Sequence, residues 1–516
     1  LQKRSVVSSF IFKFDGTPDG QPKVALFRRS EKVSTYRNYL APISGSIEPS
    51  DVSPLAAAWR EIAEETALDP SSLTFLRHGK SYTFADPSVG REWAIYPFAF
   101  ALKAPTAETE SRIAIDWEHT SWAWHDPPSV TDDPPFHGVP RLAESLHRVW
   151  FENDLGPSAG AILSSGLRSL AADNVSGARQ MAGSALRILR ETVVAFSPCV
   201  PTEEWWSVVR MAAWHLIKNG RESMSAAIQS ALLAALSDIE NRMATHPKDE
   251  KESFLPVVTK CIDDVLAQRT QSANTLSSSL TDFLVSTFPP FQSRALSLLT
   301  LSESSTITHA LLHLARSGAF AKLDIHILES RPLFEGVSLT ASLASANTNA
   351  SEVRITIHTD ASAALASHGI AAVLLGADRI ASSGAVSNKT GSLPAVLSAR
   401  YVTSGSTRAR IVVLSDTDKI APPGSASHAV EDGGAEPVAA AWTTSQRLRV
   451  AADSITAAAW TRNNKVEVAV RNVSFEWVPA ELIDVYLTER GKWTVDDIAR
   501  HAEGLKAEEE RMFGAL

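Results

Sequence analysis

The sequence predicts an α/β protein with a unit of short strands around one helix first, a helical unit second and a parallel-sheet unit last. With 516 residues, the chain is longer than one hydrophobic core usually supports. Short strand-like segments surround one helix up to about residue 125, and apolar residues then recur at helical spacing. From about residue 294, apolar strands alternate with helix-length segments, which is typical of a doubly wound parallel sheet. We therefore expect domains over 1–140, 141–290 and 291–516.

The first unit begins with an alternating apolar segment followed by Asp15-Gly16, which is a turn signal and unlike the unbroken apolar core of a signal peptide. The strands that we expect in this unit are 5–14, 24–28, 77–84, 93–102 and 120–124. Residues 126–140 contain five prolines and several acidic residues, which is typical of a linker or surface loop. The expected parallel strands of the last unit are 295–301, 322–328, 354–357, 371–375 and 410–414.

The strongest local signal is the segment 45–68, GSIEPSDVSPLAAAWREIAEETAL. Ser53 can cap a helix whose first turn contains Pro54. On that helix Glu61, Glu64 and Glu65 stand at positions i, i+3 and i+4, so we expect their carboxylates to converge on the face opposite the apolar residues.

Three clustered carboxylates repel one another unless a cation neutralises them. Oxygen ligands on a rigid helix suit Mg²⁺ or Mn²⁺, which would offset the charge of a substrate diphosphate and lower the pKa of an attacking water. Gly45 carries no side chain, so the preceding loop can approach the phosphates closely.

The segment resembles the Nudix box, in which it is matched by Gly45, Arg60, Glu61, Ile62, Glu64, Glu65 and Leu68. It departs from the box at Asp51, in the eight residues 52–59 where seven are usual, and at Ala67. The resemblance implies an α/β/α sandwich with a mixed sheet and a metal-dependent pyrophosphohydrolase. It also implies that the three glutamates bind the metal while Arg60 orients a glutamate. The implied substrate is a nucleoside diphosphate linked to another group, of which ADP-ribose is one candidate.

A second acidic position precedes the strand expected at 120–124. Glu118 is our candidate for an additional acid or base, and His119 is the alternative. Ordinary loop polarity remains an open explanation for both residues, because no spacing rule constrains them.

Four later segments follow strands and open towards helices or loops, where ligands bind in parallel sheets. They are LLTLSESSTITHALL (298–312), ILESRPLFEG (327–336), VLLGADRIASSGAVSNKTGS (373–392) and RNVSFEWVPAELIDVYLTERG (471–491). They resemble the family that unites the alpha, beta and delta subunits of translation initiation factor 2B with isomerases of ribose 1,5-bisphosphate and methylthioribose 1-phosphate. The resemblance implies a Rossmann-like domain behind a helical subdomain, a phosphorylated small-molecule ligand and a homodimer or higher homo-oligomer.

Polar side chains in these segments are candidates for ligand contacts. Ser304 and Ser305 stand at an expected helix N-terminus, whose free N–H groups favour a phosphate. Arg331 and Lys389 supply positive charge, and Asp378 ends an apolar strand. For Ser304 and for Asn388, capping a helix or closing a turn is an equally good explanation.

The departures from the isomerases concern two positions. Ser302 stands where the isomerases carry a catalytic cysteine, and Ser176 precedes Gly177-Ala178 where they carry an arginine. A serine lacks the low pKa of a reactive thiol. We therefore expect binding or assembly rather than isomerase activity. Two alternatives stay open, namely a non-catalytic scaffold resembling a translation factor and a bifunctional enzyme with isomerase activity.

Composition excludes several classes of function. The formal net charge of −9 argues against nucleic acid or an anionic membrane as the main partner. Two cysteines, Cys199 and Cys261, cannot form a disulfide framework, and we expect both to be small buried apolar residues. No apolar run approaches the roughly 20 residues needed to span a bilayer. A cytoplasmic location fits these features.

Overall fold

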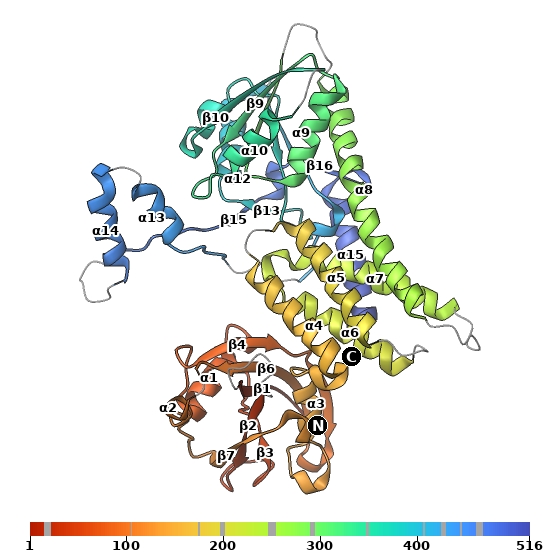
Figure 1. The fold of residues 1–516 in the computed structure, drawn as a ribbon, viewed down its shortest axis with the longest axis vertical. Coiled ribbons are helices and arrows are strands. Elements are labelled where there is room, and N and C mark those ends of the chain that lie inside the picture. Colours follow the sequence, from red (N-terminus) through yellow and green to blue (C-terminus); the bar gives the residue numbers. More distant parts are fainter. Residues whose placement is uncertain are drawn as a thin grey trace.

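The computed structural model describes twelve segments of the chain, which are 1–14, 22–104, 106–173, 176–196, 202–245, 254–288, 295–346, 350–405, 408–424, 430–443, 446–460 and 468–516. Figure 1 shows three units along the long axis of the molecule, with a helical unit between an N-terminal sheet and a second sheet. This order and the α/β class confirm the fold expected from the sequence.

The N-terminal sheet is mixed. Its strands are β1 Gln2–Lys13, β2 Lys23–Arg29, β3 Leu40–Ala41, β4 Leu73–His78, β5 Tyr82–Asp86, β6 Arg91–Leu102 and β7 His119–His125. The order is β3-β2-β1-β6-β4, with β5 also paired to β6 and β7 to β2. Strands β1 and β6 run parallel over most of their length, and the other pairs are antiparallel.

One predicted strand of this sheet is wrong. The segment 77–84 is divided between β4 and β5, which both pair with β6 but are separated where the Gly79 backbone bonds to Pro97. The pattern of apolar residues did not reveal this break, since both flanks alternate in the same way.

Helices cover both faces of the N-terminal sheet. Helix α1, Pro54–Thr66, buries Ala58 and Ile62 against one face. The other face packs against α3, Leu142–His147, which contributes Leu142 and Leu146 to the same apolar cluster as Phe12. Between these elements lie the short helices α2 Ala107–Glu110, η1 Pro87–Val89, η2 Pro127–Ser129 and η3 Pro134–Phe136. The segment 126–140 is therefore packed along the sheet, where Leu40 pairs with Gly138.

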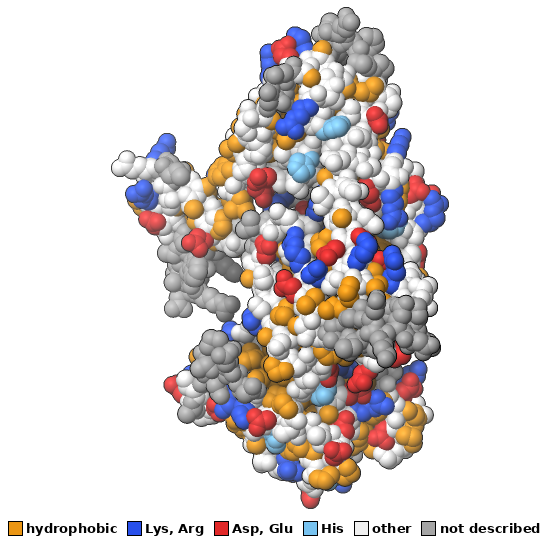
Figure 2. Space-filling model, turned by 45° about the vertical axis from the view of Figure 1, so that its right-hand side comes forward, with side chains coloured by type: hydrophobic (Ala, Val, Ile, Leu, Met, Phe, Trp, Pro, Cys, Tyr) orange, Lys and Arg blue, Asp and Glu red, His pale blue; other side chains and the backbone are white. Residues whose placement is uncertain are grey.

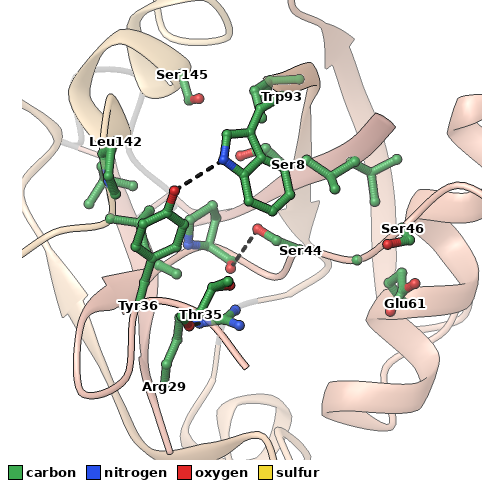
Figure 3. A pocket seen from close by; sticks show the side chains of 18 of the residues that line it. Ser8, Arg29, Thr35, Tyr36, Ser44, Ser46, Glu61, Trp93, Leu142 and Ser145 are labelled. Atoms are coloured by element: carbon green, nitrogen blue, oxygen red, sulfur yellow. Dashed lines mark hydrogen bonds between the residues drawn. The ribbon is translucent and has the colours of Figure 1, made fainter. Parts of the chain in front are cut away.

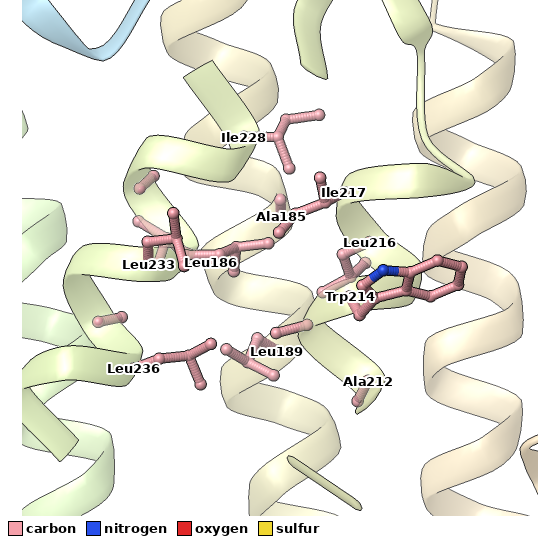
Figure 4. Close-up of a cluster of buried hydrophobic side chains, with 14 of the residues drawn as sticks. Ala185, Leu186, Leu189, Ala212, Trp214, Leu216, Ile217, Ile228, Leu233 and Leu236 are labelled. Carbon is pink, nitrogen blue, oxygen red and sulfur yellow. The ribbon is translucent and has the colours of Figure 1, made fainter. Parts of the chain in front are cut away.

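The middle unit is a bundle of helices with a shared apolar core. Its helices are α4 Glu152–Ala172, α5 Ala178–Phe196, α6 Glu203–Lys218, η4 Glu222–Met224, α7 Ser225–Thr245 and α8 Leu255–Thr287. Figure 4 shows Leu186 and Leu189 of α5 facing Leu216 of α6 and Leu233 of α7. The connector expected at 245–252 lies, beyond its first residue, outside the described residues.

The second large sheet has the order β10-β9-β8-β11-β14-β16-β17. Its strands are β8 Leu296–Leu301, β9 Lys322–Leu328, β10 Glu352–His358, β11 Ala372–Leu375, β14 Arg410–Leu414, β16 Val485–Thr488 and β17 Gly491–Trp493. All pairs except β16 with β17 are parallel, which confirms the predicted sheet. A small antiparallel sheet joins β12 Arg379–Ile380, β13 Val386–Lys389 and β15 Phe475–Val478.

Helices flank the parallel sheet on both faces. The end of α8 packs with α9 Ser305–Ser317 and α10 Glu335–Ala344 on one face. The opposite face packs against α11 Ala363–Ala366, α12 Ser392–Val402 and α15 Val495–Phe513. The short helices η5 Asp360–Ser362, η7 Thr417–Lys419 and η8 Ala480–Leu482 complete this unit. Helices α13 Glu436–Thr443 and α14 Gln446–Trp460 project away from the body of the molecule (Figure 1).

The first two units are joined by a buried polar interface. The Arg77 guanidinium forms two-pronged hydrogen bonds with the Glu152 carboxylate and stacks on Phe151 at 4.2 Å. The Asn219 side chain accepts a 2.6 Å hydrogen bond from the His78 N–H and donates to the His78 carbonyl. The N-terminal sheet is therefore fixed on the helical unit.

Within the described residues, no helix is both long and apolar enough to cross a membrane. Positive and negative side chains are interspersed over the face of the molecule seen in Figure 2. Cys261 is a buried residue of α8, as expected, whereas Cys199 lies outside the described residues.

Candidate functional site

The acidic helix α1 begins as the sequence predicts. Ser53 accepts a 3.1 Å hydrogen bond from the Ala56 N–H, and Pro54 occupies the first turn. The helix ends at Ala67, whose backbone is left-handed (φ +56°). This is the conformation that glycine adopts most easily, so an alanine at the second glycine position of the box keeps the turn at some conformational cost.

Arg60 connects the loop before α1 to the glutamates of the helix. Its guanidinium donates to both carboxylate oxygens of Asp51 (3.1 and 2.9 Å) and to the Ser46 carbonyl (3.0 Å). It also donates to Glu61 at 2.8 Å and to Glu64 at 3.2 Å. The Asp51 that replaces the usual glutamate is thus a direct partner of Arg60, which holds the loop and the helix together.

The three glutamates of α1 differ in their surroundings. Glu64 is the exposed one, with 59% of its side chain accessible, whereas Glu61 and Glu65 are 13% and 5% accessible. The sequence placed all three carboxylates on one face opposite the apolar residues. Glu65 instead lies buried against the sheet, where the nearest His119 nitrogen is 3.6 Å away.

Burial and like charges shift the pKa of these carboxyls. Burial, reinforced by Glu61 and Glu118, raises the pKa of Glu65 to about 10. Burial also raises the pKa of Glu61 and of Glu118. The pKa of His119 falls to about 4 because the ring is buried, and the imidazole is therefore neutral at pH 7. Among the described residues, neither ring nitrogen has a hydrogen-bond partner. The site therefore concentrates carboxyl groups, of which Glu61 and Glu64 are paired with Arg60.

These residues match a divalent cation in donor type and charge. Carboxylate oxygens are the ligands that Mg²⁺ and Mn²⁺ prefer, and a cation would offset both the burial and the like-charge repulsion that raise the carboxyl pKa values. In the part of the chain that the structure describes, however, no three His, Cys, Asp or Glu side chains converge closely enough to hold an ion. Glu61 and Glu65 are brought together, and Glu64 is turned towards solvent.

A cavity of about 300 Å³ opens beside α1. Figure 3 shows Glu61 on one side of it and Arg29 on another, with Tyr36 and Trp93 across from the helix. Gly45 and Glu118 also line this cavity, whereas Glu64 and Glu65 do not. The wall farthest from α1 includes Leu142 and Ser145 of α3.

A second cavity, of about 420 Å³, lies at the carboxyl ends of the strands of the parallel sheet. Arg331, which follows β9, and Lys389, which ends β13, both line it. The Lys389 ammonium lies 2.9 Å from the Glu335 carboxylate, while the Arg331 side chain is half exposed. The backbone N–H groups of Ser330 and Arg331 both donate to Asp360, which fixes this loop.

Comparison with known proteins identifies both parts of the chain. Residues 174–495 match the model of the initiation factor 2 subunit family. The chain belongs to this family. Residues 3–148 match the model of the NUDIX domain. The chain is thus a Nudix domain fused to an initiation factor 2 subunit domain, which confirms both resemblances drawn from the sequence.

Individual relatives share a limited fraction of identical residues with the chain. The chain is 31% identical over 207 residues to a methylthioribose-1-phosphate isomerase of Rhodopirellula baltica. The aligned segment covers 39% of this chain and 51% of the isomerase. The chain therefore spans about half the length of this curated relative. The translation initiation factor eIF-2B of Pyrococcus horikoshii has 17% identity and a TM-score of 0.43, covering 65% of this chain and 98% of its own. The 5-methylthioribose 1-phosphate isomerase of the same organism has 17% identity and a TM-score of 0.45, covering 67% and 87%.

Other candidate residues of the initiation factor 2 subunit domain do not line the second cavity. Ser304 caps α9, of which Ser305 is the first residue, and Asn388 donates a 2.9 Å hydrogen bond to Ser392. Ser302 is buried in a left-handed turn (φ +66°), where its N–H donates to Ser330. The side chains of Ser304 and Asn388 therefore have structural partners. This agrees with the alternative explanation for both residues, in which they cap a helix or close a turn.

Asp378 belongs to a buried polar cluster behind the cavity. Burial raises its pKa, while Lys419 and then Lys389 oppose that shift. Lys419 is itself buried and donates to the Ala377 carbonyl. Arg179, from the helical unit, pairs with the neighbouring Asp416 at 2.6 Å. The cluster joins the helical unit to the sheet.

Several site residues were missed from the sequence. Arg29, Tyr36 and Trp93 line the first cavity, and Arg221 and Glu431 line the second. Only the paired arginines 28–29, at the end of the strand predicted at 24–28, offered a signal, and an exposed strand end looks the same as a pocket wall in the sequence. The remaining residues come from distant segments that carry no shared motif.

Proposed function

We propose that the Nudix domain is a divalent-cation-dependent pyrophosphohydrolase of a nucleoside diphosphate linked to another group, with ADP-ribose as one candidate. The observation that carries this proposal is the cavity of about 300 Å³ that Gly45, Glu61 and Glu118 line together beside the Nudix helix. Hydrolysis belongs to the domain 1–140, with α3 completing its cavity. Residues 141–290 and 291–516 form the helical and Rossmann-like domains of the second module.

Each residue of the site has a proposed role. Glu61, Glu64 and Glu65 hold Mg²⁺ or Mn²⁺, which when bound offsets phosphate charge and lowers the pKa of water. Arg60 orients Glu61 through the 2.8 Å hydrogen bond and keeps the Gly45 loop against the helix through Asp51. Glu118, which lines the cavity and whose pKa is raised by burial, accepts the proton of the attacking water.

We further propose that the second module binds a phosphorylated small molecule and holds the protein in a homodimer or higher homo-oligomer. Arg331 and Lys389 line the cavity and supply positive charge, while Ser302 in place of the isomerase cysteine favours binding without turnover. On the side of the parallel sheet that α11, α12 and α15 cover, apolar side chains are exposed on α11 and α12, namely Leu365, Leu397 and Tyr401. We call these residues the apolar face and assign them, together with the stretch 470–478 near the cavity, to the contact between copies.

A panel of nucleoside diphosphate compounds, incubated with Mg²⁺ or Mn²⁺ and followed by chromatography of the products, tests the first proposal. We expect cleavage between the two phosphates of at least one compound and none after chelation of the metal. If no compound of the panel is cleaved, the alternative is a regulatory scaffold that resembles translation initiation factor 2B.

A further inference from the structure

Arg29 lines the Nudix cavity although it lies outside the Nudix box in the sequence. It is the last residue of β2, and the register shift between Arg28 and Arg29 places it opposite His119 of β7. The next residue, Ser30, donates its N–H to the Glu118 carbonyl at 2.7 Å. Strand pairing therefore brings the Arg29 side chain to the same end of the sheet as the acidic residues, although none of the box residues is near it in sequence.

The Arg29 guanidinium has N–H donors available for a ligand. Its Nε atom donates to the Thr35 carbonyl at 3.3 Å, and among the described residues no carboxylate forms an ion pair with it. Glu118 and Glu65 attract it from a distance, but burial outweighs them and lowers its pKa. Figure 3 shows the guanidinium at the cavity, which Glu61 lines from the side of α1. An anion in the cavity would thus meet N–H donors opposite the acidic helix.

The part of the cavity away from α1 has flat aromatic walls. The Trp93 indole donates a 3.1 Å hydrogen bond to the Tyr36 hydroxyl, which donates to Asp86 at 2.8 Å. The two ring centroids are 6.3 Å apart at an angle of 44°. Because both rings are held by hydrogen bonds, they lose little conformational freedom when a planar group packs against them.

We propose that Arg29 binds the diphosphate of the substrate on the side opposite α1, and that the group beyond the diphosphate is a nucleobase lying against Tyr36 and Trp93. The proposal rests on the proposed function and adds the orientation of the substrate. A guanidinium matches two phosphate oxygens with two parallel hydrogen bonds. Arg29 is a direct ligand contact, and the aromatic pair selects a base over a sugar or a bare diphosphate.

Calorimetry with two non-hydrolysable probes in Mg²⁺ separates the two contacts. The probes are α,β-methylene-ADP and methylenediphosphonate, which share the same two phosphorus groups and differ in the adenosine. We expect Arg29→Ala to weaken both probes about tenfold or more. Trp93→Leu should weaken only α,β-methylene-ADP, also by about tenfold. The matched control is Arg28→Ala, because the Arg28 side chain bonds to the Asn38 carbonyl and does not line the cavity.

The outcomes distinguish this inference from the proposed function, because binding is measured without turnover. Unchanged affinity of Arg29→Ala for both probes, with an unchanged melting temperature, would overturn the role of Arg29 even in an active hydrolase. Equal losses in Arg29→Ala and Arg28→Ala would show a general charge effect and would also overturn it. Arg29→Lys keeps the charge without the planar fork, and we expect it to recover only part of the affinity.

Discussion

Gly45 lies directly against the carboxylate of Glu61, so that a Cβ at position 45 would stand 1.9 Å from the Glu61 Cδ atom. No side chain fits there unless the carboxylate moves. The glycine of the box thus has a packing role in addition to any approach to phosphate. Loop and helix are fitted to each other at this point, and Arg60 clamps them from the outside.

Gly45→Ala should therefore displace the Glu61 carboxylate and abolish divalent-dependent hydrolysis. We expect divalent-cation affinity, measured by calorimetry, to fall at least tenfold. Gly504→Ala is the control, since a Cβ there meets no atom within 4 Å. In the interior of helix α15 this change should stabilise the protein by about 0.5–1 kcal/mol. Wild-type cation affinity in Gly45→Ala would contradict the packing argument.

Glu65→Gln and Glu64→Gln should each abolish divalent-dependent hydrolysis with little loss of fold. Gln keeps the shape of Glu65 and removes a carboxylate that burial and Glu61 disfavour. The melting temperature of the metal-free Glu65→Gln variant should therefore equal or exceed that of the wild type. Glu108→Gln, at a highly exposed position of the same domain, should keep full activity. Wild-type turnover in either site variant would refute the metal assignment.

Asp416→Asn should destabilise the protein in a pH-dependent way. Burial opposes ionisation of Asp416, but Arg179 and then Lys419 outweigh it and lower its pKa. A lowered folded-state pKa contributes stability above the unfolded value of about 3.9, and this stability is lost as the pH falls through the folded-state pKa. At pH 7 the variant should lose about 3 kcal/mol, because the Arg179 charge is left without its partner.

Melting temperatures of the wild type and of Asp416→Asn between pH 3 and pH 7 provide the measurement. The difference should be largest near neutrality and shrink towards pH 3. Asp263→Asn is a matched control, since Asp263 pairs with Arg190 at the surface and should change stability by less than about 0.5 kcal/mol. A difference that stays constant over this range would argue against the ion pair as the cause.

Arg331→Ala should weaken the binding of a phosphorylated ligand to the second module. We expect AMP, ribose 5-phosphate or ribose 1,5-bisphosphate to bind, and the substitution to cost about 1.5–3 kcal/mol, which is at least a tenfold loss of affinity. Arg354→Ala, on an exposed position of β10, should bind as the wild type does. Calorimetry that detects no binding of any of the three to the wild type would leave this module with assembly alone.

Tyr401→Asp should convert the proposed homodimer into a monomer. Tyr401 is 90% exposed on the apolar face, and a carboxylate there would be buried without a partner between two copies. Val52→Asp, on a 94% exposed position of the Nudix domain, should leave the dimer intact. Light scattering on the full chain measures both. A wild-type monomer at micromolar concentration, or a dimeric Tyr401→Asp variant, would count against the assignment.

Local features of the site were predictable because short-range chemistry determines them. The Ser53 cap, the Pro54 turn and the ligand helix follow from residues within one segment. The burial of Glu65 was not predictable, because it depends on how α1 packs against the sheet, with His119 beside Glu65, rather than on helical spacing. The same reason explains why Glu64, at an equivalent spacing from Glu61, is exposed.

The walls of both cavities lay beyond sequence reasoning for a different reason. Arg29 enters the site through a shift in strand register, and Arg221 and Glu431 meet through an ion pair between segments far apart in the chain. Motif residues such as Arg331 and Lys389 were found because the resemblance placed them at strand ends. Ser304 and Asn388 came from the same motifs, yet hydrogen bonding within the fold engages both.

Helix α3 makes the two halves of this protein hard to exchange. The Ser145 hydroxyl lies 2.7 Å from that of Tyr82, and Leu142 faces the Nudix cavity, while the same helix leads directly into α4. A recombination event, or an engineered chimera, that joined a new partner after residue 140 would carry away one wall of the cavity. The Nudix cavity therefore keeps all of its walls only where residues 142–147 stay with the domain that precedes them.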